Sequence, residues 1–349
     1  MDIRVGRSMR GAGRRSSWMA AGLALAVLAA SACSGAPSRP RSDAGPETVV
    51  LASRQTTDEA AKTLASLRRV DDLPLYEMTY SGDYDALVNL TSTPTPSPFG
   101  CSLFIASGDR DRPLFGRNFD WDPNPGLVLH TDPPDGYASI SIVDMAYLGI
   151  GADPTGDRRL LNAPLLPFDG MNERGLVVGL AADDSGSLTP DPNKPTVGSV
   201  RVLRLVLDEA ATVDEALAVF GRYNLDFDDG PPLHYLIADA TGASAVVEFV
   251  DGRMRVLPGE RSWQVLTNIR LADVDEAQRN RDRRYETAST ALGRAGGRVD
   301  SRAAMDILRA VAQSHTRWSV TYELRTGEVR VVTGQRWETV HEYRLRMSN

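Results

Sequence analysis

The chain has 349 residues, of which 42% are hydrophobic and 24% charged, a composition typical of a globular protein with a sizeable core. Its formal net charge of −7 and isoelectric point near 5.3 argue against nucleic acid as a partner. It contains two cysteines, Cys33 and Cys101, and we expect no disulfide within the chain.

The first 32 residues have the pattern of an export signal. Five arginines precede an apolar run from Met19 to Ala30 that is too short to span a bilayer comfortably. The run ends in Ala30-Ser-Ala-Cys33, which resembles a bacterial lipobox, whose cysteine becomes lipidated and forms the new N-terminus. We therefore expect a signal peptide over residues 1–32 and an exported cell-envelope lipoprotein anchored at Cys33. An ordinary secretory signal with an incidental Cys33 is the alternative.

The next segments differ in composition. Residues 33–56 begin rich in proline, serine and glycine, which indicates a disordered tether. Residues 57–100 start with helical spacing of apolar residues and end in a proline-rich stretch, 91–98, so we interpret them as a propeptide and linker. Residues 101–349 are expected to form the main domain.

Strands and helices alternate downstream of residue 100. Strands are expected at residues 101–106, 114–119, 137–144, 176–180, 233–238, 245–250, 253–257, 263–267, 318–324 and 328–333. Helices are expected at residues 200–220, as two helices, and at 277–292 and 301–313. The stretch 121–134 has the turn residues of a loop. This order predicts an α+β fold of antiparallel sheets with helices packed outside.

Cys101 is a candidate nucleophile. The hairpin predicted for residues 101–119 would bring Arg117 and Asp120 back towards it, and a nearby cation lowers the pKa of a thiol. The alternative is a buried structural cysteine, because free cysteines are among the most buried residues. The proline-rich linker ends directly at Gly100-Cys101, and exposed linkers are where chains are cut, so the position suits a processing site.

A cysteine with a free α-amine would carry its own base, since the amine titrates near pH 8 and the thiol near pH 8.5. This requires the Gly100–Cys101 bond to break. We predict self-cleavage, in which the thiol attacks the carbonyl of Gly100 and gives an ester intermediate that water opens. Glycine at this position would tolerate the strained backbone that such an attack requires.

Five blocks in order resemble the choloylglycine hydrolase family of N-terminal-nucleophile (Ntn) amidohydrolases, which includes bile salt hydrolases and penicillin V acylases. The blocks are Cys101 with Phe115–Asp120, Gly170–Leu176, His234–Asp239 with Gly242 and Glu248, Val265–Asn268, and Thr316–Val320 leading to Tyr322. The resemblance implies a four-layer αββα Ntn-hydrolase sandwich, with residues 101–349 as the catalytic domain. It also implies hydrolysis of carbon–nitrogen bonds other than peptide bonds, in linear amides.

The resemblance implies a role for each matched position. Cys101 would be the nucleophile and, once freed, the N-terminal residue, with Asp120 holding the new amine and Arg117 polarising the thiol. Asn268 would supply an oxyanion-hole donor.

Two further positions follow from the same resemblance. Arg284 best matches the family's second active-site arginine, with Arg283 as a close competitor. Many bile salt hydrolases have an asparagine just after the position that matches Gly179-Leu180, where this sequence has Ala181. The resemblance therefore leaves a backbone N–H at Ala181 as the expected second oxyanion donor.

Other conspicuous residues have structural interpretations. Asn172 and Gly175 are expected to serve a turn, and Trp318 the core. His234 sits in a predicted strand and is interpreted as structural rather than as a papain-like base. We predict neither a metal nor a cofactor, because none of the histidines has metal-site spacing to cysteine or acidic residues: His130, His234, His315 and His341.

Residues and resemblance together predict an exported cysteine amidohydrolase that cleaves a small N-acyl amide through a thioester on Cys101. The substrate would be a small molecule with a hydrophobic acyl group, and membrane contact would come only through the lipid anchor. The sequence makes no prediction of oligomeric state. Two alternatives stay open: an acyltransferase that passes the acyl group to an amine, and a surface lipoprotein that binds ligands without catalysis.

Overall fold

The structure is a computed structural model that describes residues 53–88, 100–227 and 230–348. The predicted signal peptide, the lipidation site Cys33, nearly all of the tether and the proline-rich linker lie outside these residues. Within the described ranges, no helix combines the length and the apolar character that crossing a membrane requires.

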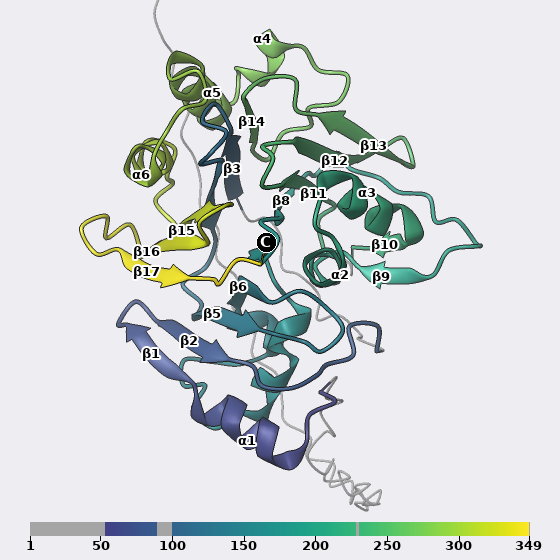
Figure 1. The fold of residues 1–349 in the computed structure, drawn as a ribbon. Helices are drawn as coiled ribbons and strands as arrows, with labels where there is room; N and C mark the ends of the chain where they lie inside the picture. Colours follow the sequence, from purple (N-terminus) through teal and green to yellow (C-terminus); the bar gives the residue numbers. More distant parts are fainter. Residues whose placement is uncertain (1–52, 89–99, 228–229, 349) are drawn as a thin grey trace, which may run out of the picture. The chain divides into compact units, whose positions relative to one another are not determined.

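One sheet has nine strands (Figure 1). They are β1 (Arg68–Asp71), β2 (Leu75–Thr79), β5 (Gly126–Thr131), β6 (Ser139–Asp144), β7 (Asp169–Asn172), β8 (Val177–Ala182), β11 (Leu233–Ala238), β12 (Ser244–Val250) and β13 (Arg253–Pro258). Neighbouring strands follow this same order across the sheet, so most of it is built by consecutive hairpins.

The second large sheet has six strands in the order β14-β3-β4-β15-β16-β17. They are β3 (Gly100–Ala106), β4 (Leu114–Asp120), β14 (Trp263–Leu266), β15 (Thr316–Glu323), β16 (Glu328–Thr333) and β17 (His341–Arg344). The predicted hairpin of residues 101–119 is confirmed as the antiparallel pair β3–β4. A small parallel pair, β9 (Thr196–Gly198) and β10 (Asn224–Asp226), lies apart from both sheets.

Six α-helices and two 3-10 helices complete the described residues. They are α1 (Thr57–Ala65), η1 (Met145–Leu148), η2 (Arg158–Leu165), α2 (Arg201–Glu209), α3 (Val213–Arg222), α4 (Glu276–Arg279), α5 (Arg283–Arg294) and α6 (Ser301–Ala310). The predicted pair of helices in residues 200–220 is confirmed, with a capping box between Thr212 and Glu215 at the start of α3. The single helix expected at 277–292 is two, because Asp282 caps a new helix, α5.

The two large sheets pack face to face, with helices on their outer faces. β3 contacts β8 between the sheets, α2 packs on β7 and β8, and α5 and α6 pack on β14, β3, β4 and β15. Gly179 allows the close approach, because an added Cβ would lie 2.7 Å from a methyl of Leu103 in the facing sheet. The layer order is therefore helix, sheet, sheet, helix, which is the predicted αββα sandwich.

Strands upstream of residue 100 belong to the same nine-stranded sheet. β2 pairs with β5, and β1 pairs with β2 at the edge. The described residues before and after position 100 accordingly belong to one compact unit. The predicted division between a propeptide, 57–100, and a main domain, 101–349, therefore does not separate two folding units, although cleavage between them stays a prediction.

The structure corrects two further expectations. The stretch 121–134, expected to be a loop, contains β5, whose residues Leu127, Val128 and Leu129 are fully buried. Turn residues on both sides hide this six-residue strand. The sheets are also not wholly antiparallel, because β2–β5 and β9–β10 are parallel pairs.

Asn172 and Gly175 serve the β7–β8 turn, as predicted. Gly175 has a φ of 78°, and an added Cβ would lie 2.1 Å from the carbonyl oxygen of Leu324. Asn172 is buried, and its Nδ2 donates to the carbonyls of Leu207 and Ala210 at the end of α2. The turn and the helix that covers it are thereby held together.

Candidate active site

Cys101 is the second residue of β3 and is completely buried. In the β3–β4 ladder it lies opposite Phe119, while Leu103 lies opposite Arg117. Since alternate residues of a strand share a face, all four side chains point towards the other sheet. Arg117 Nη2 lies 3.4 Å from Cys101 Sγ. The predicted neighbourhood of thiol and guanidinium is confirmed.

Arg117 is held in place from the facing sheet. Its Nη1 donates to the Phe168 carbonyl at 2.9 Å and to the Asp169 carboxylate, and Nη2 donates to the Leu180 carbonyl at 3.0 Å. All of these contacts are buried, so the guanidinium has one fixed orientation towards the sulfur.

Asp169 is a site residue that the sequence reasoning missed. It is fully buried, forms an ion pair with Arg117, and accepts hydrogen bonds from Tyr322 Oη and Trp318 Nε1. A signal was present, because Asp169 directly precedes the block that begins at Gly170. Trp318, expected in the core, is there, and its ring stacks on Phe119 with centroids 4.1 Å apart.

The electrostatic balance at Cys101 differs from the expectation. Burial raises the pKa of the Cys101 thiol; Arg117 opposes this effect, and the charge of Asp120 adds to it. Arg117 therefore acts in the predicted direction, but the net shift is upward. In the intact chain, burial thus favours the protonated thiol of Cys101, and Arg117 favours the thiolate.

Asn268 and Arg284 reach the backbone of Cys101. Asn268 Oδ1 accepts a hydrogen bond from Cys101 N at 2.7 Å, and Arg284 Nη1 donates to Cys101 O at 2.7 Å. Arg284 Nη2 also donates to Asn268 Oδ1 at 3.0 Å. Arg283, one residue earlier in α5, is exposed. Of the two arginines left open by the sequence, the structure brings Arg284 to the site.

Asp120 lies on the other face of its strand from the sulfur. It pairs with Gly100 and turns its carboxylate towards the helices, where Gln313 Nε2 donates at 2.7 Å and Thr316 Oγ1 at 2.5 Å. Burial raises its pKa, and Thr316, Gln313 and Arg284 partly offset the shift. In the intact chain the N–H of Cys101 donates to Asn268 Oδ1. The predicted contact of Asp120 concerns the amine that cleavage would free, and it stays a prediction.

Position 100 has no room for a side chain, which accounts for the glycine there. The φ of Gly100 is not in the left-handed region. Whether glycine helps the backbone to strain during the attack stays a prediction. A Cβ on Gly100 would instead lie 2.3 Å from Gln313 Nε2 and 3.2 Å from Asp120 Oδ2. The hydrogen bond between Gln313 and Asp120 therefore occupies the room that a side chain would need.

The predicted backbone donor moves by one residue. N–H and C=O groups of successive strand residues point to opposite edges. Leu180 N donates towards β7, and Leu180 O accepts from Arg117. The backbone N–H and C=O groups of Ala182 point to the same strand edge as those of Leu180, and the Ala182 carbonyl accepts from Asn268 Nδ2 at 2.9 Å. Ala181 lies between them and faces β11. The N–H on the Cys101 side is therefore that of Ala182, not of Ala181.

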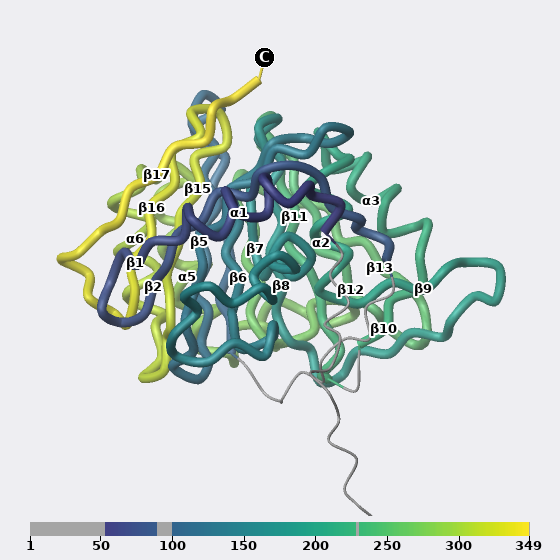
Figure 2. Tube along the Cα trace, turned by 90° about the horizontal axis from the view of Figure 1, so that it is seen from below, coloured from purple at the N-terminus to yellow at the C-terminus, as the bar shows by residue number. Residues whose placement is uncertain are grey.

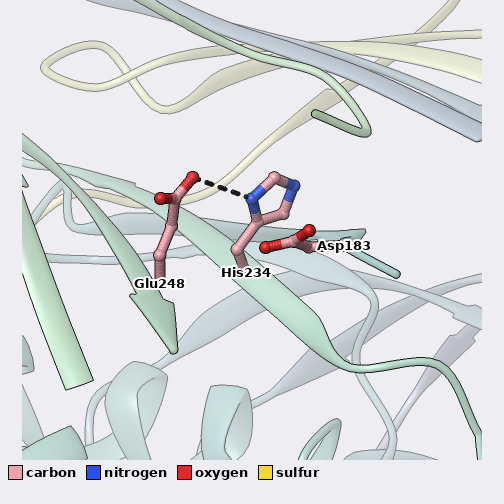
Figure 3. A group of neighbouring side chains, drawn as sticks. All are labelled: Asp183, His234 and Glu248. Atoms are coloured by element: carbon pink, nitrogen blue, oxygen red, sulfur yellow. Dashed lines mark hydrogen bonds and ion pairs between the residues drawn. The ribbon is translucent and has the colours of Figure 1, made fainter. Parts of the chain in front are cut away.

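One group of three potential metal ligands occurs among the described residues (Figure 3). Asp183, His234 and Glu248 are buried, and one ligand atom of each lies within 4.8 Å of the others. His234 Nδ1 lies 3.3 Å from Glu248 Oε1, and Nε2 lies 2.7 Å from the carbonyl oxygen of Thr267. Both ring nitrogens are thus directed away from Cys101, in agreement with a structural role for His234.

Comparisons with known proteins agree with this geometry. Residues 101–273 match the sequence model of the linear amide C–N hydrolases, choloylglycine hydrolase family. A penicillin V acylase of Pectobacterium atrosepticum is 33% identical over 187 residues, 48% of each chain, so this chain spans about half the length of that relative.

Solved structures match over a longer stretch. A mutant form of a conjugated bile acid hydrolase from Clostridium perfringens has a TM-score of 0.55 at 18% identity, covering 72% of this chain and 93% of that one. A penicillin V acylase from Agrobacterium tumefaciens has a TM-score of 0.51 at 18% identity, with coverage of 70% and 86%. At this identity the likeness shows the fold.

Proposed function

Since this chain belongs, through residues 101–273, to the choloylglycine hydrolase family of linear amide C–N hydrolases, we propose that it hydrolyses a small N-acyl amide with Cys101 as nucleophile. The observation that carries the proposal is the convergence of Arg117, Asn268 and Arg284 on this one residue. A fixed cation beside a sulfur favours the thiolate, and amide donors stabilise the charge that develops on a carbonyl oxygen.

Activation begins with the Gly100–Cys101 bond. Cys101 Sγ attacks the carbonyl carbon of Gly100, the C–N bond breaks, and the nitrogen takes up the proton to become a free α-amine. Water then hydrolyses the resulting thioester, which leaves a carboxylate on Gly100 and a thiol on Cys101. The complete burial of Cys101 supports an intact chain whose sulfur an external substrate does not reach.

Turnover uses the freed amine as the proton carrier. The amine accepts the thiol proton, and the thiolate, paired with Arg117, attacks the amide carbonyl carbon of the substrate. Asn268 Nδ2 and the N–H of Ala182 donate to the oxyanion, and one such donor contributes roughly 3–4 kcal/mol to catalysis. The amine protonates the leaving nitrogen as the C–N bond breaks. Water hydrolyses the acyl-thioester and regenerates the thiol.

The substrate class follows from this chemistry and from the names of the relatives. An acyl group on a neutral nitrogen is common to penicillin V and to conjugated bile acids, which two of the matched proteins are named for. We propose a linear amide with a hydrophobic acyl group, and penicillin V is the first compound to test.

The deciding experiment is a screen of penicillin V and fluorogenic N-acyl amides on purified protein, with products identified by mass spectrometry. We expect release of the free acid by wild type and none by Cys101→Ala. Ser102→Ala is the matched control, because Ser102 is the next residue of β3 and is also buried. Equal rates in Cys101→Ala, or turnover by a chain still intact at 100–101, would contradict the proposal. A new amide formed with an added amine would identify an acyltransferase.

We propose that the protein is exported and anchored by a lipid on Cys33. Support comes from the sequence pattern of residues 1–33, which lie outside the described part of the chain. In cells fed an alkyne-labelled fatty acid, we expect labelling of wild type but not of Cys33→Ala, and release of the variant from the membrane fraction. Equal labelling of both would refute the anchor.

A further inference from the structure

Asn268 lies in a short loop, residues 267–272, that follows β14 in the six-stranded sheet. The carbonyl of Thr267, which shares a peptide bond with Asn268, accepts a hydrogen bond from His234 Nε2 at 2.7 Å. His234 belongs to β11 in the nine-stranded sheet and is completely buried. A side chain from one sheet therefore fixes the peptide bond that carries the proposed oxyanion donor in the other.

Glu248 holds the far end of the same loop. This residue of β12 accepts hydrogen bonds from the N–H of Leu271 at 2.7 Å on Oε1 and from the N–H of Ala272 at 2.8 Å on Oε2. With the contact at Thr267, two buried side chains thus form hydrogen bonds to the loop at three backbone positions. These side chains are linked to each other, because His234 Nδ1 lies 3.3 Å from Glu248 Oε1.

The partners of the two side chains fix the direction of these hydrogen bonds. A carbonyl oxygen can only accept, so His234 Nε2 donates to Thr267. Burial alone would raise the pKa of Glu248, but its contacts with His234 and with two backbone N–H groups lower it, so the carboxylate accepts both backbone hydrogens of the loop.

We propose that His234 and Glu248 are positioning residues that hold residues 267–272 and thereby direct the Asn268 side chain at Cys101. The inference rests on the proposed function only in giving Asn268 a catalytic task. Neither residue touches the sulfur, and their effect passes through the loop.

The first test needs no enzymatic activity. In a Cys101→Ala background, we compare the parent with its Glu248→Gln variant at pH 7.5. Hydrogen exchange followed by mass spectrometry should show faster exchange across residues 267–272 in Glu248→Gln than in its parent. Elsewhere in β12, exchange should stay slow if the variant is folded.

The second test measures kinetics on the activated protein. Because a displaced oxyanion donor weakens only the transition state, Glu248→Gln should lower kcat by about 10–100-fold with KM little changed. His234→Gln, which can retain a donor for the Thr267 carbonyl, should lose less than His234→Ala. His130→Gln is the matched control, because His130 pairs with Glu77 in a contact of the same kind between β5 and β2.

Three results would overturn the inference. They are unchanged exchange of residues 267–272 in Glu248→Gln, equal kinetic losses in Glu248→Gln and His130→Gln, or a stoichiometric metal ion bound at Asp183, His234 and Glu248. If wild type itself fails to turn over any amide, the proposed function fails, while the exchange measurement still tests whether Glu248 holds residues 267–272.

Discussion

At the scale of single residues, the ion pair of Arg117 and Asp169 determines how the guanidinium is oriented towards Cys101 Sγ. Arg117 is completely buried, and its guanidinium contacts both the Asp169 carboxylate and Cys101 Sγ. A buried charge that loses its partner is strongly destabilising, because nothing else compensates it. The carboxylate thus keeps the guanidinium in the core, and the guanidinium in turn faces the thiol.

Replacing Asp169 by asparagine tests this dependence. We expect Asp169→Asn to lower the free energy of unfolding by about 3–5 kcal/mol, since Arg117 is left without its counter-ion. Tyr322→Phe, which removes one hydrogen bond to the same carboxylate, should cost only about 1 kcal/mol. Urea denaturation of the three proteins measures the difference. Equal losses in both variants would mean that the charge of Asp169 is unimportant.

Gly100 gives a prediction about steric room. In Gly100→Ala, the new methyl group displaces the Gln313 amide from Asp120, and we expect cleavage at 100–101 to slow while the fold survives. Gln313→Ala in the same chain removes the clash and should restore part of the rate. A time course by mass spectrometry measures both variants. If the double variant cleaves no faster than Gly100→Ala, the effect is not steric.

Sequence patterns could predict some of these residues and not others. Cys101 and Arg117 were predictable because a hairpin with a short turn places them on one face. Ala182 was missed in favour of Ala181, because an alignment by motif does not determine to which strand edge each N–H points. Asp169 was missed because its partner Arg117 lies on another sheet. Its position just before the block at Gly170 signals nearness to the site but not this contact.

At the scale of elements, the structure departs from the expected helices and strands where a capping or turn residue lies at the end of an element. Asp282 interrupts the helical periodicity of residues 277–292 and begins α5 so that Arg284 lies in its first turn, facing Cys101. β5 was missed because clusters of proline, aspartate and glycine flank an apolar run of six residues. In both places, the capping or turn residues in the sequence do not locate the element by themselves, because its ends also depend on tertiary contacts.

Asp144, at the end of β6, predicts a dependence of stability on pH. Burial raises its pKa from 3.8 to about 6, and the hydrogen bonds from Asn124 and the N–H of Ala146 offset only part of the shift. The folded state therefore takes up a proton between about pH 4 and 6, so this residue's contribution to stability falls as pH rises through that window. The shift corresponds to a loss on the order of 3 kcal/mol above pH 6.

Asp144→Asn should remove this dependence while keeping the cap of η1, because asparagine is an equally good N-cap. Compared with wild type, the variant should be similar near pH 4 and more stable at pH 7. Urea denaturation from pH 4 to pH 7 gives the difference between the two curves. A difference that stays constant with pH would show that Asp144 does not titrate in this range.

At the scale of the whole described chain, the segment before Cys101 is integrated into the sheet. Its strand β2 lies between β1 and β5, and residues such as Tyr76, Met78 and Tyr84 are buried in a shared core. Figure 2 shows β1 and β2 beside β16 and β17, and Asp71 accepts from Thr333 Oγ1 at 3.0 Å and lies 2.7 Å from His341 Nε2. Sequence patterns could not predict this arrangement, because a parallel pairing of distant strands has no local signature.

We therefore predict that the two pieces stay together after cleavage at 100–101. On gel filtration in native buffer they should elute as one species, and they should separate only in denaturant. Asp71→Ala, which removes the buried contacts with Thr333 and His341, should lower the denaturant concentration at which they part. Elution of the small piece on its own from native wild type would contradict the prediction.

The parallel pairing of β2 with β5 has one more consequence. Once the peptide bond is broken, a strand inside the nine-stranded sheet is no longer tethered to the polypeptide that surrounds it. Renaturation then becomes a bimolecular event, without the high local concentration that a single chain provides. The mature protein would thus owe its persistence to slow unfolding, and heating should inactivate it irreversibly where its uncut precursor recovers.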